Sequence, residues 1–352
     1  MHKRFSLVFL LIMSLMFISF GASSVSIAAA SQKLDFYQLE NYILPNSNKV
    51  LLVEKDLYEL STSTLDYARN EIFARHGYIF KNENYKDYFS NKPWYKENSN
   101  FKESLLSEIE KKNAEFIRAY TNKLLAHFKK VNGHSISLDI NSDGIKENIS
   151  LNCTTGGDKF SLKVNRASIA GTGDNLDGVM YIADIDSKDK YKEIAITESG
   201  PSGDYNTYFY YYNGSTLIFM GKVQGSDFNI KVNGSGSFTT KTRGSILQTW
   251  FYTDEYKLNS NHKLSGVAKK YYKMNTIITV KRQLKLQKSP TDPAVVVTLK
   301  VGEKAMLTDT DNNKWCAVET ARGSKGWFRV ENFDNIKSLP ASEYFEGLIY
   351  AD

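Results

Sequence analysis

The sequence predicts a multidomain α+β protein with a small helical module, a central antiparallel β domain and a small C-terminal β-barrel. Three observations predict this class: helical apolar periodicity before residue 128, alternating strand-like runs after residue 134, and a length of 352 residues, which suits several small domains better than one. Hydrophobic residues make up 41% of the chain. That content is enough for packed cores and excludes a wholly disordered protein.

The first 30 residues have the pattern of an export signal. Lys3 and Arg4 precede an apolar run at 5–20, and the small residues at 28–30 offer a cleavage site before Ser31. The apolar run is shorter than the roughly 20 residues that a spanning helix needs. We therefore expect an extracytoplasmic protein, secreted or cell-wall associated, with no membrane span after cleavage. An uncleaved anchor is the alternative.

The chain carries a mild positive charge and almost no cysteine. A formal net charge of +6 is compatible with an anionic wall or membrane surface without predicting one, and we expect no nucleic-acid partner. Cys153 and Cys316 lie in strand-like runs of different modules, so we expect two small buried side chains rather than a disulfide. The Lys-, Asn-, Ile- and Tyr-rich usage resembles that of exported proteins from low-GC Gram-positive bacteria.

The first module, residues 35–128, is predicted to be helical, with two helices facing each other. Apolar residues recur at helical spacing from residue 65, and again over 102–128. Arg69 falls on the first apolar stripe and Asn113 in the middle of the second. An unpaired buried arginine costs several kcal/mol, so we expect Arg69 to contact Asn113 or a carboxylate of the long helix.

Other polar residues cluster near the end of the first helix. His76 falls on the apolar stripe, Asn70 and Glu71 are predicted to face away from it, and Gly77 suits a left-handed helix terminus. With no nucleophile and base pair in this module, we interpret the set as structural rather than catalytic. The complete set is Arg69, Asn70, Glu71, Arg75, His76, Gly77 and Asn113.

The run Phe73-Ala74-Arg75-His76-Gly77, with the flanking sequence over about 42–122, resembles the YARHG domain family. The resemblance implies an extracellular bacterial module and gives its boundaries, but it implies no chemistry. Phenylalanine stands at the first position of the naming motif, so this chain has no phenol hydroxyl there.

The central region, residues 134–274, is predicted to be an antiparallel β domain, sandwich-like or propeller-like. Short strands alternate with turns rich in Gly, Asn, Asp and Ser. A weak repeat relates the segment after Asp139 to the one after Asp184, 45 residues later. About 140 residues hold only three units of that length, too few to close a propeller, so an open or sandwich-like arrangement is favoured.

The loop at 139–147 has the oxygen-donor spacing of a calcium site, with Gly144 at its sharp turn. It resembles FG-GAP or dockerin-like loops, and a metal-free hairpin turn is the alternative. In the second repeat, Lys188 and Lys192 stand where ligands would lie, so that loop is predicted to be an empty turn. The expected donors are Asp139, Asn141, Asp143, the carbonyl of Ile145, and Glu147.

The last module, residues 276–333, has five short strand-like runs, which predict a small barrel. Its Gly302 turn, Trp315 and the run Gly326-Trp327-Phe328 resemble bacterial Src-homology-3-like (SH3-like) domains. The resemblance implies attachment to peptidoglycan or another wall polymer, with Trp315, Trp327 and Phe328 as ligand candidates. Core packing is the alternative role for each tryptophan. Residues 334–352 are predicted to form a short helix or a loosely attached end.

These features together predict an exported, non-enzymatic cell-envelope protein that binds wall polymer through its last module, with calcium as the one expected cofactor. Two alternatives remain. One is a secreted hydrolase that uses carboxylates of the β region such as Asp177, Asp184 and Asp186, although no acid and nucleophile constellation is recognisable. The other is a protein–protein interaction module.

Overall fold

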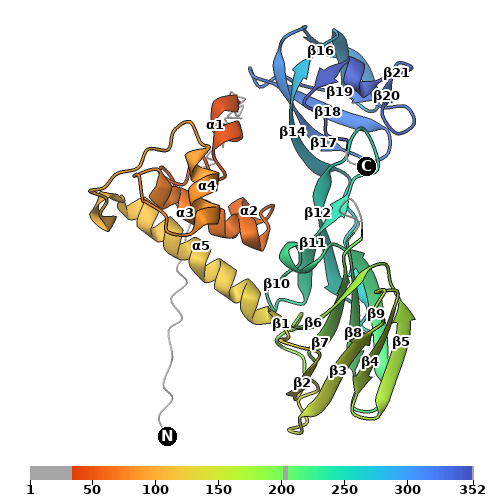
Figure 1. Cartoon of the computed structure of the whole chain (residues 1–352). Coiled ribbons are helices and arrows are strands. Elements are labelled where there is room, and N and C mark those ends of the chain that lie inside the picture. The colour runs from red at the N-terminus through yellow and green to blue at the C-terminus, as the bar shows by residue number, and fades with distance from the viewer. Residues whose placement is uncertain (1–33, 201–204, 351–352) are drawn as a thin grey trace, which may run out of the picture.

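The computed structural model describes residues 34–200 and 205–350. The expected export signal at 1–30 lies outside the described residues. Figure 1 shows helices gathered in an N-terminal module and β-sheets in the rest of the chain. No helix in the described ranges combines the length and apolar character needed to cross a membrane.

The N-terminal module packs α3 against α5. Its helices are α1 (Phe36–Asn41), α2 (Glu54–Leu57), α3 (Thr62–Ala74), α4 (Glu83–Ser90), a 3-10 turn (Glu103–Leu105) and α5 (Glu108–His127). Their core includes Leu65, Ile72 and Ile117, all fully buried. The two facing helices were correctly predicted.

The long helix begins later than expected, at Glu108 rather than at residue 102. Ser107 accepts a hydrogen bond from the Glu110 amide, and the Glu110 carboxylate accepts one from the Ser107 amide. This reciprocal capping box defines the helix start. Leu106 is extended, and Leu105 is exposed rather than part of the apolar stripe.

The central region consists of three antiparallel sheets. The first sheet has the order β1 (Phe128–Lys130), β6 (Leu176–Ala183), β7 (Glu193–Glu198), β8 (Asn206–Tyr212) and β9 (Leu217–Gln224). The second is β2 (Ser135–Leu138), β3 (Glu147–Cys153), β4 (Lys159–Val164) and β5 (Ala167–Thr172). The third is β10 (Lys231–Val232), β11 (Ser237–Arg243), β12 (Phe251–Leu258) and β13 (Leu264–Gly266), preceded by a 3-10 turn at Asp227–Asn229.

The first sheet is the middle of three layers. Ile194 and Ile196 of β7 pack into a core shared with the second sheet, whereas Ala195 packs into a core shared with the third sheet. Successive side chains of a strand point to opposite faces. Every residue of β7 is therefore buried, and the region is a layered sandwich.

The C-terminal module is one curved antiparallel sheet of seven strands (Figure 1). Its order is β16 (Asp292–Leu299), β15 (Leu284–Ser289), β19 (Lys325–Arg329), β18 (Trp315–Thr320), β17 (Lys304–Thr310), β14 (Tyr272–Val280) and β22 (Phe345–Glu346). A small hairpin of β20 (Asn335–Ile336) and β21 (Leu339–Pro340), and a 3-10 turn (Ala341–Glu343), precede β22.

One expected boundary in this part of the chain was wrong, and of the two forms expected for the tail a short helical turn is present at Ala341–Glu343. Strand β14 begins at Tyr272, inside the range assigned to the central domain. The segment after residue 334 is not loosely attached, because β22 pairs with β14 and the ring of Phe345 is buried in the module's core. Apolar residues of the tail therefore form part of the hydrophobic core of the C-terminal module.

Polar contacts join the helical module to both β parts. The Lys231 ammonium of the third sheet donates to the Tyr58 carbonyl just after α2, and burial lowers the pKa of Lys231 to about 8. Glu59 pairs with Lys241 at 2.9 Å. Glu40 of α1 pairs with Lys304 of the C-terminal module at 2.6 Å.

The two cysteines are free thiols, as expected. Cys316 is fully buried, and burial raises its pKa to about 12. Cys153 is half-buried in the central region. Neither thiol is positioned for a disulfide with the other, because the two lie in different hydrophobic cores.

Candidate functional site

Arg75 and Glu71 tie the end of α3 to the segment that precedes α2. The Arg75 guanidinium donates to Glu71 Oε1 at 2.7 Å and to the Leu44 carbonyl at 2.9 Å, and it lies over the Tyr42 ring. Glu71 also accepts the Ile43 amide at 2.6 Å. Glu71 was predicted to face solvent, but it is fully buried because the 42–44 segment covers that side of α3.

His76 and Gly77 each make a contact specific to their residue type. His76 Nε2 lies 2.9 Å from Glu110 Oε1. Burial acts to raise the pKa of Glu110, but hydrogen bonds from His76 and Ser107 hold it below its usual value. Gly77 has φ +81°, and a Cβ there would lie 2.5 Å from the Lys96 carbonyl oxygen. Glycine is therefore required where this loop crosses the helix end.

The expected contact between Arg69 and Asn113 is not formed. Asn113 instead makes three hydrogen bonds of 2.7–2.9 Å to backbone groups of the 47–52 loop. Arg69 lies over the Phe73 ring and lines a cavity of about 510 Å³ between α3 and α5. The Asn70 side-chain amide donates a hydrogen bond to the Asp66 carbonyl, one turn earlier in α3. The pairing of Arg69 with Asn113 was wrong, and the structural interpretation of the set stays a prediction.

The expected calcium loop is a tight turn between β2 and β3. Asp139 accepts the Gly144 amide at 2.9 Å, and backbone hydrogen bonds hold the pKa of Asp139 below its usual value against desolvation, which acts to raise it. Asp143 accepts the Ile145 amide at 2.8 Å. Glu147 is buried and accepts the Ile140 amide at 3.0 Å. The turn is pre-shaped by its own carboxylates, and these would have to be shared with an ion.

The second repeat has the same architecture but one residue more. Glu193 accepts the Ile185 amide at 3.1 Å, as Glu147 accepts that of Ile140, across eight residues instead of seven. Glu193, and not Lys192, is thus the counterpart of Glu147. The prediction of an empty turn used the wrong register, because one inserted residue cannot be located from a weak repeat alone.

The outer face of the C-terminal sheet carries three partly exposed aromatic rings. Trp327 on β19 lies 4.8 Å from the Tyr271 ring, centroid to centroid. Trp315 on β18 pairs with Arg329 on β19, so the two side chains lie on the same face of the sheet. Trp327 lies two residues before Arg329 on β19 and therefore shares that face. We call Tyr271, Trp315 and Trp327 the aromatic face.

An ion network borders the aromatic face. Asp309 on β17 receives hydrogen bonds from Lys273 at 2.6 Å and from Lys325. Asp309 is opposite Ala317, which is in turn opposite Trp327. Asp309 and Lys325 were not predicted as site residues. Lys325 and Trp327 alternate along one strand, and this spacing places both side chains on one face.

Phe328 does not belong to the aromatic face. Its side chain is 3% exposed and packs against Phe345 in the core. It neighbours Trp327 in sequence and so points to the opposite face of the sheet. The expectation that Phe328 contacts a ligand was therefore wrong.

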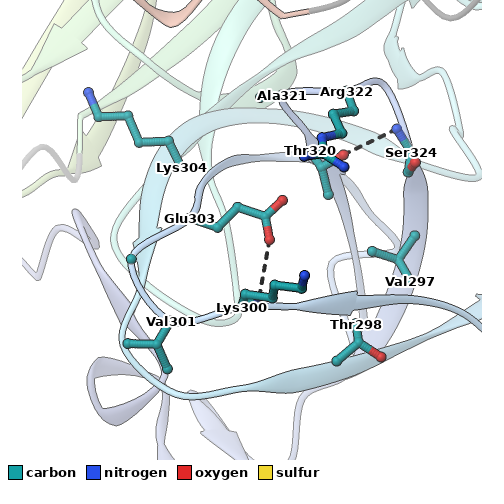
Figure 2. A pocket seen from close by; sticks show the side chains of 11 residues that line it. Val297, Thr298, Lys300, Val301, Glu303, Lys304, Thr320, Ala321, Arg322 and Ser324 are labelled. Atoms are coloured by element: carbon teal, nitrogen blue, oxygen red, sulfur yellow. Dashed lines mark hydrogen bonds between the residues drawn. The ribbon is translucent and has the colours of Figure 1, made fainter.

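A cavity of about 550 Å³ opens between the β16–β17 and β18–β19 turns. Figure 2 shows Glu303 pointing into it beside Lys300, whereas Lys304 points away. The Glu303 carboxylate accepts the Lys300 amide at 3.0 Å, and Arg322 lines the far turn. The cavity adjoins the hairpin that carries Trp315 and Trp327.

Two carboxylates of the hydrolase alternative, those of Asp177 and Asp184, are not brought together. Asp177 and Asp184 lie at opposite ends of β6, on the order of 20 Å apart for an extended strand. Paired catalytic carboxylates of glycosidases lie about 5–9.5 Å apart. The Asp177 carboxylate accepts a hydrogen bond from Thr197, and the Asp186 carboxylate accepts the Lys188 amide at 3.1 Å, so both carboxylates have structural partners.

Comparison with known proteins identifies one part of the chain. The model of the YARHG domain family matches residues 40–122, which confirms the expected resemblance and its boundaries. The match spans the helical module, including the Arg75, His76 and Gly77 contacts, and does not extend into the β sheets. The comparisons with curated proteins and with solved structures found no match.

Proposed function

We propose that this is an exported, non-enzymatic cell-envelope protein that binds peptidoglycan or another wall polymer through the aromatic face. The observation that carries the proposal is the placement of three partly exposed rings beside a fixed ion network. The apolar faces of sugar rings pack on tryptophan and tyrosine, and Lys273 and Lys325, which Asp309 holds in place, supply donors for polar substituents.

The sequence resemblance to bacterial SH3-like domains favours the same role for this module. The neighbouring cavity offers groups of both charge signs, because the Glu303 carboxylate lines it together with Lys300 and Arg322. A polymer that contacts both places would run along the β18–β19 hairpin, with sugar rings on the aromatic face and polar substituents at the cavity.

We also propose calcium as a ligand of the Asp139 loop. The support is the spacing of Asp139, Asp143 and Glu147 and the sharp turn at Gly144, which has φ +86°. Calcium there would fix the connection between β2 and β3 and stabilise the second sheet. It has no contact with the aromatic face, so the two roles are separable.

The test is retention on purified cell-wall sacculi. The full chain should sediment with sacculi, and Trp327→Ala and Trp315→Ala should each weaken binding about tenfold, the effect of losing roughly 1.4 kcal/mol of stacking energy. Phe219→Ala, which removes an exposed ring in the central region, is the control.

Three outcomes discriminate the alternatives. Folded tryptophan variants that bind as tightly as the parent would refute a role for the aromatic face. Release of soluble wall fragments by the parent chain would support the hydrolase. If the protein does not bind sacculi but binds another envelope protein, the result would support the protein–protein interaction alternative.

A further inference from the structure

A histidine and two carboxylates meet at a junction between the first and third sheets. Asp189 and Glu193 belong to the β6–β7 connection and the start of β7, and His262 belongs to the β12–β13 turn. Across residues 34–200 and 205–350, this is the one group of three or more His, Cys, Asp or Glu side chains whose candidate ligand atoms all lie within 4.8 Å of one another. Nothing in the proposed wall binding uses these residues.

Glu193 orients the imidazole. Its carboxylate is fully buried, with Oε2 accepting the Ile185 amide and Oε1 at 2.8 Å from His262 Nε2. A carboxylate that accepts a hydrogen bond from Nε2–H leaves Nδ1 with its lone pair free. Such a carboxylate–histidine pair is the usual outer partner of a metal-binding imidazole, because it fixes the tautomer and the ring orientation.

His262 Nδ1 faces Asp189. Nδ1 lies 3.6 Å from Asp189 Oδ2, too far for a hydrogen bond. It is close to the roughly 3.4 Å that separates two ligands of one tetrahedral ion with bonds near 2.1 Å. The rings of Tyr191 and Tyr211 pack against the imidazole at 5.0 and 4.5 Å and hold its plane.

The charge of the cluster also favours a cation. In the described part of the chain, His262 provides the one basic nitrogen within 4.0 Å of the Asp189 or Glu193 carboxylate. The nearby Lys192 pairs with Asp184 instead. The side chains of Asp189 and His262 are 28% and 15% exposed, so an ion can enter from solvent.

We propose that His262 Nδ1 and Asp189 Oδ2 bind a divalent first-row transition ion of the zinc class, with Glu193 as the outer partner and water completing the coordination. Imidazole is a poor ligand for calcium and magnesium and a good one for zinc. The ion would fasten the β12–β13 turn to the β6–β7 connection, and thereby the third sheet to the first.

The test is Zn²⁺ titration of the metal-stripped full chain against a chromophoric zinc indicator, together with thermal unfolding. We expect one equivalent of Zn²⁺ to bind and to raise the melting temperature. Asp189→Asn and His262→Ala should each weaken binding at least tenfold, and Glu193→Gln about 10–100-fold, as for loss of an outer partner. His134→Ala, which removes an exposed histidine, is the control and should bind as the parent does.

Asp189→Asn keeps the proposal testable if His262→Ala fails to fold, since Asp189 is at the solvent edge. Folding of each variant is checked by circular dichroism. Parent binding no tighter than that of folded Asp189→Asn would overturn the proposal. So would a melting temperature of the parent that does not change with Zn²⁺, which would make the cluster a hydrogen-bonded clasp between the β12–β13 turn and the β6–β7 connection.

Discussion

Arg75 Nη2 lies 2.7 Å from Oε1 of Glu71, one helical turn earlier, and the two side chains are 10% and 0% exposed. This ion pair is buried where the YARHG motif ends α3. Both partners also bind backbone groups of the 43–44 segment. The pair therefore joins the end of α3 to the 43–44 segment, which is distant in the sequence.

Glu71→Gln should destabilise the protein strongly. The substitution leaves the Arg75 guanidinium buried without a counter-charge, a change that costs about 3–5 kcal/mol in other proteins. Chemical denaturation followed by circular dichroism measures it. Glu115→Gln, which removes the exposed partner of Arg118, is the control and should change stability little. Equal stability of the two variants would contradict a structural role for the motif.

Asn113→Ala should release the 47–52 loop. Three backbone groups lose their side-chain partner, and a buried unsatisfied group costs about 1–3 kcal/mol. We expect a loss of about 2–4 kcal/mol and faster amide hydrogen exchange confined at first to this loop. The exposed Asn122→Ala should leave exchange unchanged. Uniform acceleration along the whole chain would argue against a local tether.

Calcium should stabilise the central region through the Asp139 loop. At ten times the dissociation constant, ligand binding adds about 1.4 kcal/mol to the free energy of unfolding. Asp143→Asn removes one carboxylate and should abolish the rise in melting temperature, whereas Asp158→Asn, in another exposed turn, should not. A parent melting curve that is identical in millimolar calcium and in chelator would show that the loop is a metal-free turn.

Asp309 should make the C-terminal module sensitive to acid. Burial acts to raise the pKa of Asp309, but Lys273 and Lys325 outweigh it and hold that pKa below its ordinary value of 3.8. A carboxylate whose pKa is depressed by folding stabilises the protein at pH values above its ordinary pKa. This stabilisation is lost as the pH falls through the folded-state pKa.

The melting temperatures of the parent and Asp309→Asn should therefore differ most near neutral pH and converge below about pH 4. Glu346→Gln, at an exposed position of β22, serves as the control and should show no such convergence. A difference between the parent and Asp309→Asn that stays constant from neutral to acid pH would mean that the carboxylate acts through packing rather than through its charge.

Features set by neighbouring residues could be predicted from the sequence. The two facing helices follow from apolar periodicity, and the antiparallel strands follow from alternation and turn residues. The start of the long helix was not predicted, because the helix was expected to begin at residue 102, five residues before the capping box of Ser107 and Glu110. The YARHG boundaries followed from a dense local motif.

The side-chain partners depended on the tertiary structure. Glu71 reaches residues 27 and 28 positions away, and Asn113 reaches residues more than 60 positions away. Periodicity placed Glu71 toward solvent because it cannot show that a second segment covers that side of α3. It likewise could not show that the tail after residue 334 enters the C-terminal core.

The sequence by itself therefore determined that a small helical module precedes a mostly antiparallel β region, since this depends on backbone preferences and on short-range side-chain spacing. The tertiary structure alone decided which polar groups meet. His262 lies 69 residues from Glu193, and Lys325 lies 16 residues from Asp309. Such pairs form because packing of the hydrophobic cores fixes sheet order and register, and a register shift of one residue moves a side chain to the opposite face.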